Sequence, residues 1–233
     1  CALACVKTFF LRAVLFCGHY YVAMSGLISP KKHSHLWPLV FLLLTLSPGS
    51  GANEPTDWPY YGGNAGNTQH STLSQINRDN VSQLKPAWTY RSARGAELFP
   101  TSELQLNPLI VRNRLFGRNP EHQVFAVDAA SGRELWTFDP FEHEAGLLGS
   151  YMRGLSYWEH GNERRLFFTA SHSLYALDAD SGELVETFAD GGILDLRRHL
   201  GRDPDQISVY SPSPGAVFEN LIIMGSAVTE GEG

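Results

Sequence analysis

An arginine in an aromatic setting is the first feature of the sequence that could bind a ligand. Arg153 precedes Gly154 in the stretch Tyr-Met-Arg-Gly-Leu-Ser-Tyr-Trp at 151–158. The planar guanidinium offers five N–H donors in a rigid fork, which matches a carboxylate. An arginine that stacks on a tyrosine or tryptophan ring inside a sheet would have the same neighbours. The residues alone leave carboxylate binding and ring stacking equally open for Arg153.

Two further stretches offer oxygen atoms. Ser211 opens Ser-Pro-Ser-Pro-Gly, which places hydroxyl groups at a rigid bend; a plain proline-rich turn is favoured unless a ligand is close. Glu230 and Glu232 follow an apolar run at 220–225. Carboxylates at the end of a strand can hold a hard cation such as Ca²⁺ through oxygen. From the residues alone, a solvated acidic loop is favoured over a metal site.

Several common catalytic patterns are missing from the sequence. It contains no Gly-rich phosphate loop, no zinc-type spacing of cysteine and histidine, and no nucleophile elbow. The histidines are scattered, and His122 and His172 occupy equivalent positions of an internal repeat. That equivalence favours a structural or turn role for both over catalysis. No catalytic residue is assigned from these patterns.

The internal repeat indicates which elements must position these residues. Residues 122–138 and 172–188 share eight identical aligned residues at a spacing of fifty. Such a period indicates one supersecondary unit used several times, as in a solenoid, a propeller or an array. Two or three units of such an array are seldom a finished protein.

Each copy of the repeat predicts a strand, a tight turn and a second strand. The first strands are apolar or aromatic, as buried strands require, and an Asp-x-x-Ser-Gly turn follows each of them. Trp136, in the second strand of the first copy, needs a partner for its indole N–H if it is buried. The predicted strands are 124–127, 134–138, 174–177 and 184–188 within the copies, and 108–111, 114–116, 165–169 and 220–225 outside them.

A four-stranded unit of about fifty residues has the size of a propeller blade. The sequence therefore predicts an all-β fold, a β-propeller of antiparallel four-stranded blades, of which this chain holds about three. The alternative is an ordinary antiparallel β-sandwich in which the similarity of the two copies arose by chance. Outside the strands, a short helix is expected at 76–84, with Asp79 or Asn80 near its start, and a long charged connection at 191–205.

The first 53 residues differ in composition from the rest. They hold four of the 18 basic residues and none of the 24 acidic ones, so residues 54–233 are acidic, which argues against a nucleic-acid partner. Residues 24–52 have the features of a secretory signal peptide, with Lys31 and Lys32 before an apolar run and small residues at the end. An uncleaved N-terminal anchor is the alternative.

Residues 1–23 are expected to be an upstream extension of uncertain role or a first membrane segment. All three cysteines, Cys1, Cys5 and Cys17, fall in this stretch. The expected mature part, 53–233, can therefore form neither a disulfide nor a thiolate site, even in an oxidising compartment.

Several motifs spread over 57–233 are similar to those of one known family. They are the opening block at 57–63, the segments 75–81, 84–90 and 107–111, both Ala-x-Asp-Ala-x-Ser-Gly turns, and the stretches 153–158, 201–204 and 222–226. Together they resemble the pyrroloquinoline quinone (PQQ)-dependent dehydrogenases, the quinoprotein alcohol and glucose dehydrogenase family. The turn alone is weak, since scaffold propellers share it; the opening block joined to Arg-Gly-Leu-Ser-Tyr-Trp is much more specific.

The resemblance implies an eight-bladed propeller with PQQ and Ca²⁺ on its axis. Arg153 matches the arginine that contacts the carboxylates and oxygens of the quinone, and Ser211 falls within one or two positions of a hydroxyl residue that contacts it. Glu230 falls where the family places its first calcium-ligating carboxylate. The calcium-ligating Asn and the catalytic Asp base are expected beyond residue 233. Adjacent cysteines, which alcohol-oxidising members often carry before this arginine, are absent from 148–152, and this resembles the sugar or uncharacterised branch.

The resemblance also implies a function. It implies a periplasmic oxidoreductase that oxidises an alcohol or sugar hydroxyl, with hydride transfer to Ca-bound PQQ, and that passes electrons to an acceptor such as a cytochrome or a membrane quinone. Residues 53–233 would be the N-terminal part of its propeller domain, inactive or aggregation-prone when isolated. The alternatives are a non-catalytic propeller scaffold of the outer-membrane assembly type, which needs neither Arg153 nor Glu230, and a truncated remnant without activity.

Overall fold

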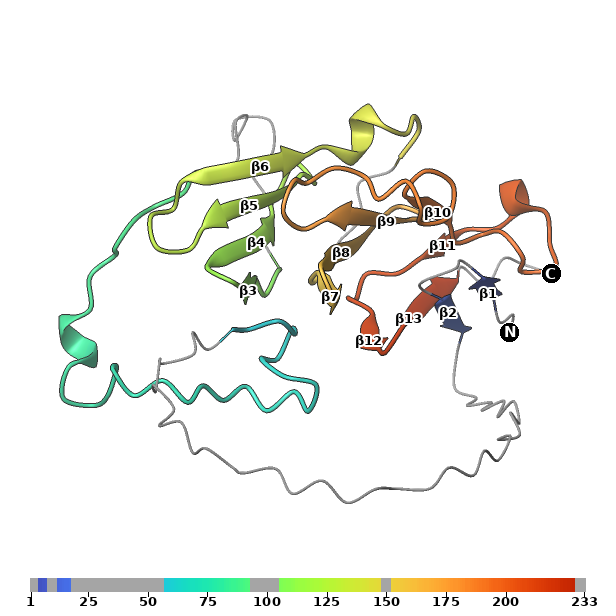
Figure 1. The fold of residues 1–233 in the computed structure, drawn as a ribbon. Helices are drawn as coiled ribbons and strands as arrows, with labels where there is room; N and C mark the ends of the chain where they lie inside the picture. Colours follow the sequence, from blue (N-terminus) through green and yellow to red (C-terminus); the bar gives the residue numbers. More distant parts are fainter. Residues whose placement is uncertain (1–3, 8–11, 18–56, 93–104, 148–151, 229–233) are drawn as a thin grey trace, which may run out of the picture. The chain divides into compact units, whose positions relative to one another are not determined.

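The structure, a computed structural model, describes residues 4–7, 12–17, 57–92, 105–147 and 152–228. Contacts divide the chain into two units, one of residues 1–18 with 55–233 and one of residues 19–54. The second unit, and with it the whole of the predicted signal segment at 24–52, lies outside the described residues. The described part of the first unit is built from β-strands and three 3₁₀ turns (Figure 1).

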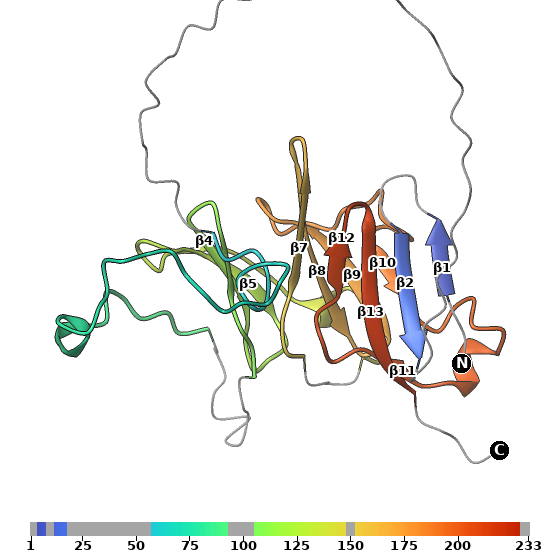
Figure 2. The same ribbon diagram turned by 90° about the horizontal axis from the view of Figure 1, so that it is seen from below.

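Two antiparallel four-stranded sheets form the centre of this unit (Figure 2). In each sheet the strands are hydrogen-bonded in chain order, as the predicted blade requires. The first sheet consists of β3 (Leu109–Val111), β4 (Arg114–Arg118), β5 (Val124–Asp128) and β6 (Glu134–Phe138). The second consists of β7 (Ser156–His160), β8 (Glu163–Ala170), β9 (Ser173–Asp178) and β10 (Ile193–Asp195). The all-β, blade-like architecture is confirmed.

The last strand of the second sheet is not the one predicted. In 184–188 only Leu184 bridges Leu177 on β9, and the chain then turns, with Phe188 N–H donating to the Val185 carbonyl. Phe188 is buried and packs edge-on against Phe167, with ring centroids 5.4 Å apart. Because this turn takes the chain into the core, 184–188 cannot continue as a strand. The edge is supplied instead by β10, which lies inside the stretch predicted to be a connection.

The third sheet is mixed rather than wholly antiparallel. Its long strand β13 (Leu221–Val228) contains the predicted strand at 220–225 except for its first residue. On one side β13 pairs antiparallel with β11 and β12, and on the other it pairs in parallel with β2. The remaining strands of this sheet are β1 (Ala4–Lys7), β2 (Arg12–Cys17), β11 (Val209–Tyr210) and β12 (Ala216–Phe218).

The predicted Asp-x-x-Ser-Gly turns are confirmed in both copies of the repeat. Asp128 Oδ1 accepts hydrogen bonds from the backbone N–H and the hydroxyl of Ser131, at 2.8 and 2.7 Å. Gly132 and Gly182 close the two turns with φ of 71° and 78°, in the left-handed region that glycine adopts without strain.

Tryptophans tie these turns to the preceding part of the chain. The indole N–H of Trp88 donates to Ala129 O at 3.1 Å, and that of Trp136 donates to Ala179 O at 3.3 Å. Each ring lies on the turn glycine, so a Cβ added at Gly182 would come within 2.5 Å of the Trp136 ring. Each tryptophan thus satisfies its N–H on the turn of the next repeat, and Trp136 joins the first sheet to the second.

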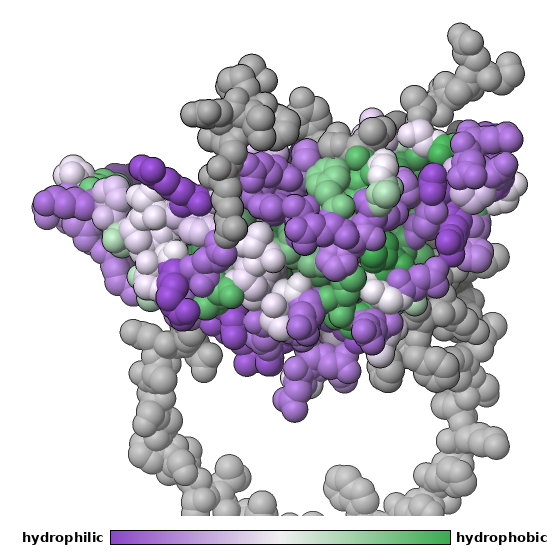
Figure 3. Space-filling view, turned by 90° about the horizontal axis from the view of Figure 1, so that it is seen from above, coloured by the Kyte–Doolittle hydropathy of each residue, from purple (hydrophilic) through white to green (hydrophobic). Residues whose placement is uncertain are grey.

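Two hydrophobic cores lie between the sheets. One joins residues of the first two sheets, among them Phe116, Phe138 and Tyr175, and the other joins the second and third sheets through residues such as Phe167 and Ile222. Figure 3 shows hydrophobic patches among hydrophilic residues on one face of the molecule. The sheets are therefore held together by shared side-chain packing, as successive blades of a propeller are.

In the described ranges, helical structure is limited to single turns. The helix predicted at 76–84 is only the 3₁₀ turn η1 (Val81–Gln83); Asn80 stands at its N-cap but its side chain makes no capping hydrogen bond. The other turns are η2 (Pro140–Glu142) and η3 (Pro204–Gln206). Among the residues that the structure describes, no helix has the length and apolar character needed to cross a bilayer.

Candidate functional site

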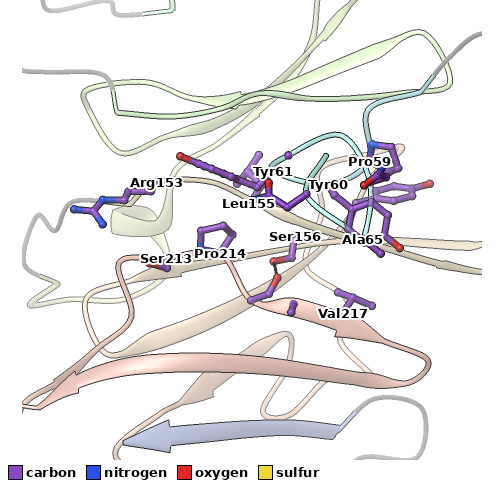
Figure 4. A pocket seen from close by; sticks show the side chains of 16 residues that line it. Pro59, Tyr60, Tyr61, Ala65, Arg153, Leu155, Ser156, Ser213, Pro214 and Val217 are labelled. Atoms are coloured by element: carbon purple, nitrogen blue, oxygen red, sulfur yellow. Dashed lines mark hydrogen bonds between the residues drawn. The ribbon is translucent and has the colours of Figure 1, made fainter. Parts of the chain in front are cut away.

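An open pocket of about 420 Å³ lies between the opening block and the sheets that follow it (Figure 4). One wall comes from the loop at 59–67 and the other from β7, β12 and the Ser-Pro-Ser-Pro turn. In Figure 4 Arg153 lies at one end of the pocket, and its guanidinium points away from the other labelled side chains. The lining residues are Pro59, Tyr60, Tyr61, Gly62, Asn64, Ala65, Asn67, Arg153, Leu155, Ser156, Tyr157, Ser213, Pro214, Gly215, Ala216 and Val217.

The backbone of Arg153 is fixed while its side chain is exposed. Its N–H donates to Pro212 O at 2.8 Å, and its carbonyl accepts from the Asn107 N–H at 3.4 Å. Within the described part of the chain, no hydrogen bond, ion pair or cation–π contact engages its guanidinium. Ring stacking, the alternative left open by the sequence, is made instead by Arg165, which lies 5.1 Å over the Trp158 ring. The fork of Arg153 therefore faces outward from a rigid base and is available to a ligand.

The two serines of the proline-rich turn have different surroundings. Ser211 is buried, and its hydroxyl donates to Gly225 O at 2.6 Å, while its carbonyl accepts from Thr169 Oγ1. Ser213, two positions further on, lines the pocket together with Arg153. Cofactor contact by Ser211 stays a prediction, since in this structure its hydroxyl holds the turn against β13. Sequence reasoning did not single out Ser213, although the tolerance of one or two positions around Ser211 includes it.

The predicted metal ligand cannot be placed. Glu230 lies outside the described residues, as does Glu232. Over the described ranges, no group of three or more His, Cys, Asp and Glu residues could hold a metal ion. The part of the site that the structure shows is thus the arginine end.

A carboxylate anchors the connection that leads from β6 to Arg153. Glu144 accepts hydrogen bonds from Ser173 Oγ at 2.9 Å and from Tyr175 Oη at 2.6 Å, both on β9. Burial, and then the Glu144 carboxylate, raises the pKa of the Tyr175 phenol well above its usual value, so Tyr175 remains a donor. In the first copy Phe125 stands where Tyr175 stands in the second. The hydroxyl that binds Glu144 is therefore a difference between the copies, which the repeat could not predict.

His122 and His172 lie in the turns that lead into β5 and β9, where the repeat placed them. His122 adopts a φ of 71°, and its ring contacts Arg118. The carbonyl of His172 accepts from the Leu196 N–H at 2.9 Å, and its Nε2 lies 3.5 Å from Glu144. Both contribute to the turns, and neither lines the pocket.

Known proteins with similar sequences are named as quinoprotein or quinone-linked dehydrogenases. Quinoprotein glucose dehydrogenase of Escherichia coli is 34% identical over 191 residues, which cover 75% of this chain and 24% of that protein. Quinate/shikimate dehydrogenase (quinone) of Acinetobacter baylyi is 28% identical over 80% of this chain and 26% of its own length. The chain thus spans about a quarter of the length of the curated relatives it matches.

Solved structures show the same fold. Quinohemoprotein alcohol dehydrogenase from Comamonas testosteroni matches 76% of this chain and 24% of its own, with a TM-score of 0.57 and 25% identity. A europium-containing methanol dehydrogenase matches with a TM-score of 0.52 at 21% identity, covering 76% of this chain and 28% of its own, which supports the fold alone. The family model described as "PQQ: Glucose/ethanol/alcohol dehydrogenase, beta-propeller domain" matches residues 58–233. The chain therefore belongs to the PQQ β-propeller family of glucose, ethanol and alcohol dehydrogenases.

Proposed function

We propose that the protein to which this chain belongs is a PQQ-dependent dehydrogenase that oxidises an alcohol or sugar hydroxyl. One observation carries the proposal: the guanidinium of Arg153 points outward at one end of the pocket, has no partner among the described residues, and stands on a backbone held by Asn107 and Pro212. The five-donor fork of an arginine matches the carboxylates of a planar polycarboxylate such as PQQ. The residues present therefore fit the carboxylate end of the cofactor.

The role proposed for this chain is to bind and orient the cofactor. Arg153 would donate to its carboxylate and carbonyl oxygens, and Ser213 or the nearby Ser211 would add a hydroxyl on the same side. When bound, PQQ supplies a hydride acceptor and Ca²⁺ a Lewis acid. The general base that takes the substrate proton is expected beyond residue 233, so the described residues supply one wall of the site.

The remaining parts of the proposal rest on the sequence. Ca²⁺ is proposed as the metal, with Glu230 as one oxygen ligand. Export to the periplasm is proposed from the composition of 24–52, and the electron acceptor is proposed to be a cytochrome or a membrane quinone. The names of the relatives support an alcohol or a sugar as the substrate class.

Substitution of Arg153 tests the proposal. In the full-length gene product, Arg153→Gln removes the charge and the fork, and loss of hydrogen bonds to a charged group predicts that the dissociation constant for PQQ rises by about 10- to 100-fold. Arg153→Lys keeps the charge without the fork, so its dissociation constant for PQQ should lie between those of the wild type and Arg153→Gln. The dissociation constant is read from a PQQ titration followed by absorbance, with and without Ca²⁺.

Arg78→Gln is the matched control. Arg78 is also exposed, but it lies outside the pocket, and its loss should leave PQQ binding unchanged. Equal binding by wild-type and Arg153→Gln proteins would contradict the proposed role of Arg153. Absence of PQQ binding by the wild-type protein, with no thermal stabilisation by PQQ and Ca²⁺, would favour the scaffold alternative.

A further inference from the structure

The opening block at 57–63 is a folded element that lies against the first sheet. Trp58 exchanges two backbone hydrogen bonds with Ile110 on β3, at 2.6 and 3.0 Å, and Asp57 Oδ1 accepts from the Arg112 N–H at 3.0 Å. Gly63, with φ of 91°, lies under the Trp58 ring, where an added Cβ would come within 2.9 Å. The block is therefore anchored at its start and folded back on itself, which gives Tyr61 a defined position.

Tyr61 lies against the peptide that carries Arg153. A Cβ added at Gly154 would lie 3.0 Å from Tyr61 Cδ2 and 3.1 Å from Pro214 Cγ, which is closer than ordinary van der Waals contact. Gly154 is buried, and Figure 4 shows Tyr61 and Pro214 next to Arg153. The residue after Arg153 is thus enclosed between a ring and a proline from segments that are far apart in the sequence.

Asn107 connects the opening block to the Arg153 peptide through hydrogen bonds. Its side chain donates to Tyr61 O at 3.3 Å, its N–H donates to Arg153 O at 3.4 Å, and it forms a parallel bridge with Gly154. On the other side, the Arg153 N–H donates to Pro212 O at 2.8 Å. The backbone on which Arg153 stands is therefore fixed from both sides by the opening block, Asn107 and the proline-rich turn.

We propose that Tyr61 and Gly154 are positioning residues, which fix the Arg153 peptide and so set the place from which the guanidinium reaches its ligand. This inference rests on the proposed function, because it assumes that Arg153 binds the carboxylate of a quinone. It assigns a role to the opening block, which does not itself supply a charged group to the pocket. Because the backbone is already held in place, less of the arginine has to be ordered when the ligand arrives, which lowers the entropic cost of binding.

Gly154→Ala in the full-length gene product tests the role of the glycine. The added methyl group must push Tyr61 or Pro214 aside by a few tenths of an ångström, and the Arg153 peptide moves with them. Misplacement of this size predicts that the dissociation constant for PQQ rises by about tenfold. The dissociation constant is measured by PQQ titration, and the melting temperature of the PQQ-free protein is measured in parallel.

Two substitutions separate the ring of Tyr61 from its hydroxyl. Tyr61→Phe keeps the ring atom that contacts Gly154, so PQQ affinity should stay within about twofold of wild type. Tyr61→Ala removes the ring, and its affinity should fall by about as much as that of Gly154→Ala. If the methyl group acts by displacing this ring, the loss in the double variant is smaller than the product of the two single losses.

Gly117→Ala controls for a general loss of stability. A Cβ at Gly117 would come within 2.6 Å of the Phe125 ring, and its three nearest atoms all belong to Phe125 in the first sheet. This variant should melt at a lower temperature and still bind PQQ with wild-type affinity at a temperature where it is folded. PQQ affinity that follows melting temperature alone across the variants would overturn the positioning role.

The outcome for the wild-type protein distinguishes the two proposals. If the wild-type protein binds PQQ and Arg153→Gln weakens binding, the proposed function stands, and unchanged affinity in both Gly154→Ala and Tyr61→Ala sinks only the positioning role. If the wild-type protein does not bind PQQ, the proposed function fails and this inference fails with it.

Discussion

His122 shows how the packing of one turn changes the protonation of a residue that the repeat marks as structural. Burial and then the Arg118 guanidinium lower the pKa of His122 from 6.5 to about 4, while Asp139 acts in the opposite direction. The His122 ring nitrogen Nδ1 contacts Arg118 Nη2, so a proton on the ring would place two cations together. The folded state therefore favours the neutral ring.

This preference predicts an acid-sensitive contribution to stability. Between pH about 6.5 and about 4 the unfolded chain binds a proton at His122 and the folded chain does not, so the free energy of unfolding falls as pH decreases through this window. His122→Asn removes the titrating group at a position of positive φ that asparagine tolerates. The variant should have a shallower fall of melting temperature between pH 6.5 and 4.5 than the wild type, measured by differential scanning calorimetry.

His70→Asn is the control, because His70 is exposed, and it should keep the wild-type slope. Carboxylates with a lowered pKa change the stability only at pH values below this window. Asp195 is an example: burial raises its pKa, but hydrogen bonds from Arg197 outweigh burial and hold the pKa below 3.8. Parallel melting curves of the wild type and His122→Asn across the window would show that His122 does not contribute.

At the candidate site, the sequence identified the residue with the chemistry but not the residues that hold it. Arg153 was marked by its type and by the glycine and aromatic residues beside it. Tyr61, Asn107 and Ser213 were not, because their relation to Arg153 comes from contacts between segments 46 to 92 residues apart. No local spacing encodes such contacts, and a hydroxyl at 211 looks the same in sequence as a hydroxyl at 213.

At the scale of the element, the repeat predicted turns and inner strands well because their causes are local. Asp128 and Ser131 bond to each other within the turn, and Gly132 has the positive φ that its residue type favours. The last strand of the second sheet could not be predicted in this way. Phe188 is identical in type and repeat position to Phe138, yet Phe138 ends a strand and Phe188 turns into a core formed with Phe167.

The contact between Trp136 and Gly182 predicts a large effect from a single methyl group. Gly182→Ala imposes a side chain on a φ of 78° and a clash with the Trp136 ring at 2.5 Å. Left-handed backbone alone costs about 1–2 kcal/mol for a residue with a Cβ, and the displaced ring adds to this, so we expect a loss of about 3 kcal/mol or more in the free energy of unfolding. Urea denaturation followed by tryptophan fluorescence measures it.

Gly161→Ala separates the two causes. Gly161 has a φ of 60°, but an added Cβ would meet nothing within 4 Å, so this variant should lose only the backbone part, about 1–2 kcal/mol. Equal losses in Gly161→Ala and Gly182→Ala would contradict a stabilising contact between Trp136 and the turn of the second sheet.

At the scale of the whole molecule, the segment between the opening block and the first sheet exposes aliphatic side chains. The segment between Trp58 and Trp88 is held at both ends, by Ile110 on β3 and by Ala129 O respectively. Between these anchors, four aliphatic side chains are more than half exposed: Leu73, Ile76, Val81 and Leu84. Exposed aliphatic residues gathered on one segment promote association between chains, as do edge strands such as β6, which pairs with only one other strand among the described residues.

Replacement of these four residues by serine should therefore raise the monomeric fraction of the 233-residue chain without lowering its stability. Because the side chains are already exposed, each substitution should change the free energy of unfolding by no more than about 0.5 kcal/mol. Size-exclusion chromatography with light scattering measures the monomeric fraction, and thermal denaturation measures the stability. Leu177→Ser, at a fully buried leucine of β9, is the opposite case and should unfold the chain. If the serine variant aggregates as much as the wild type, association proceeds through the strand edges instead, and charged substitutions on an edge strand such as β6 would be needed to prevent it.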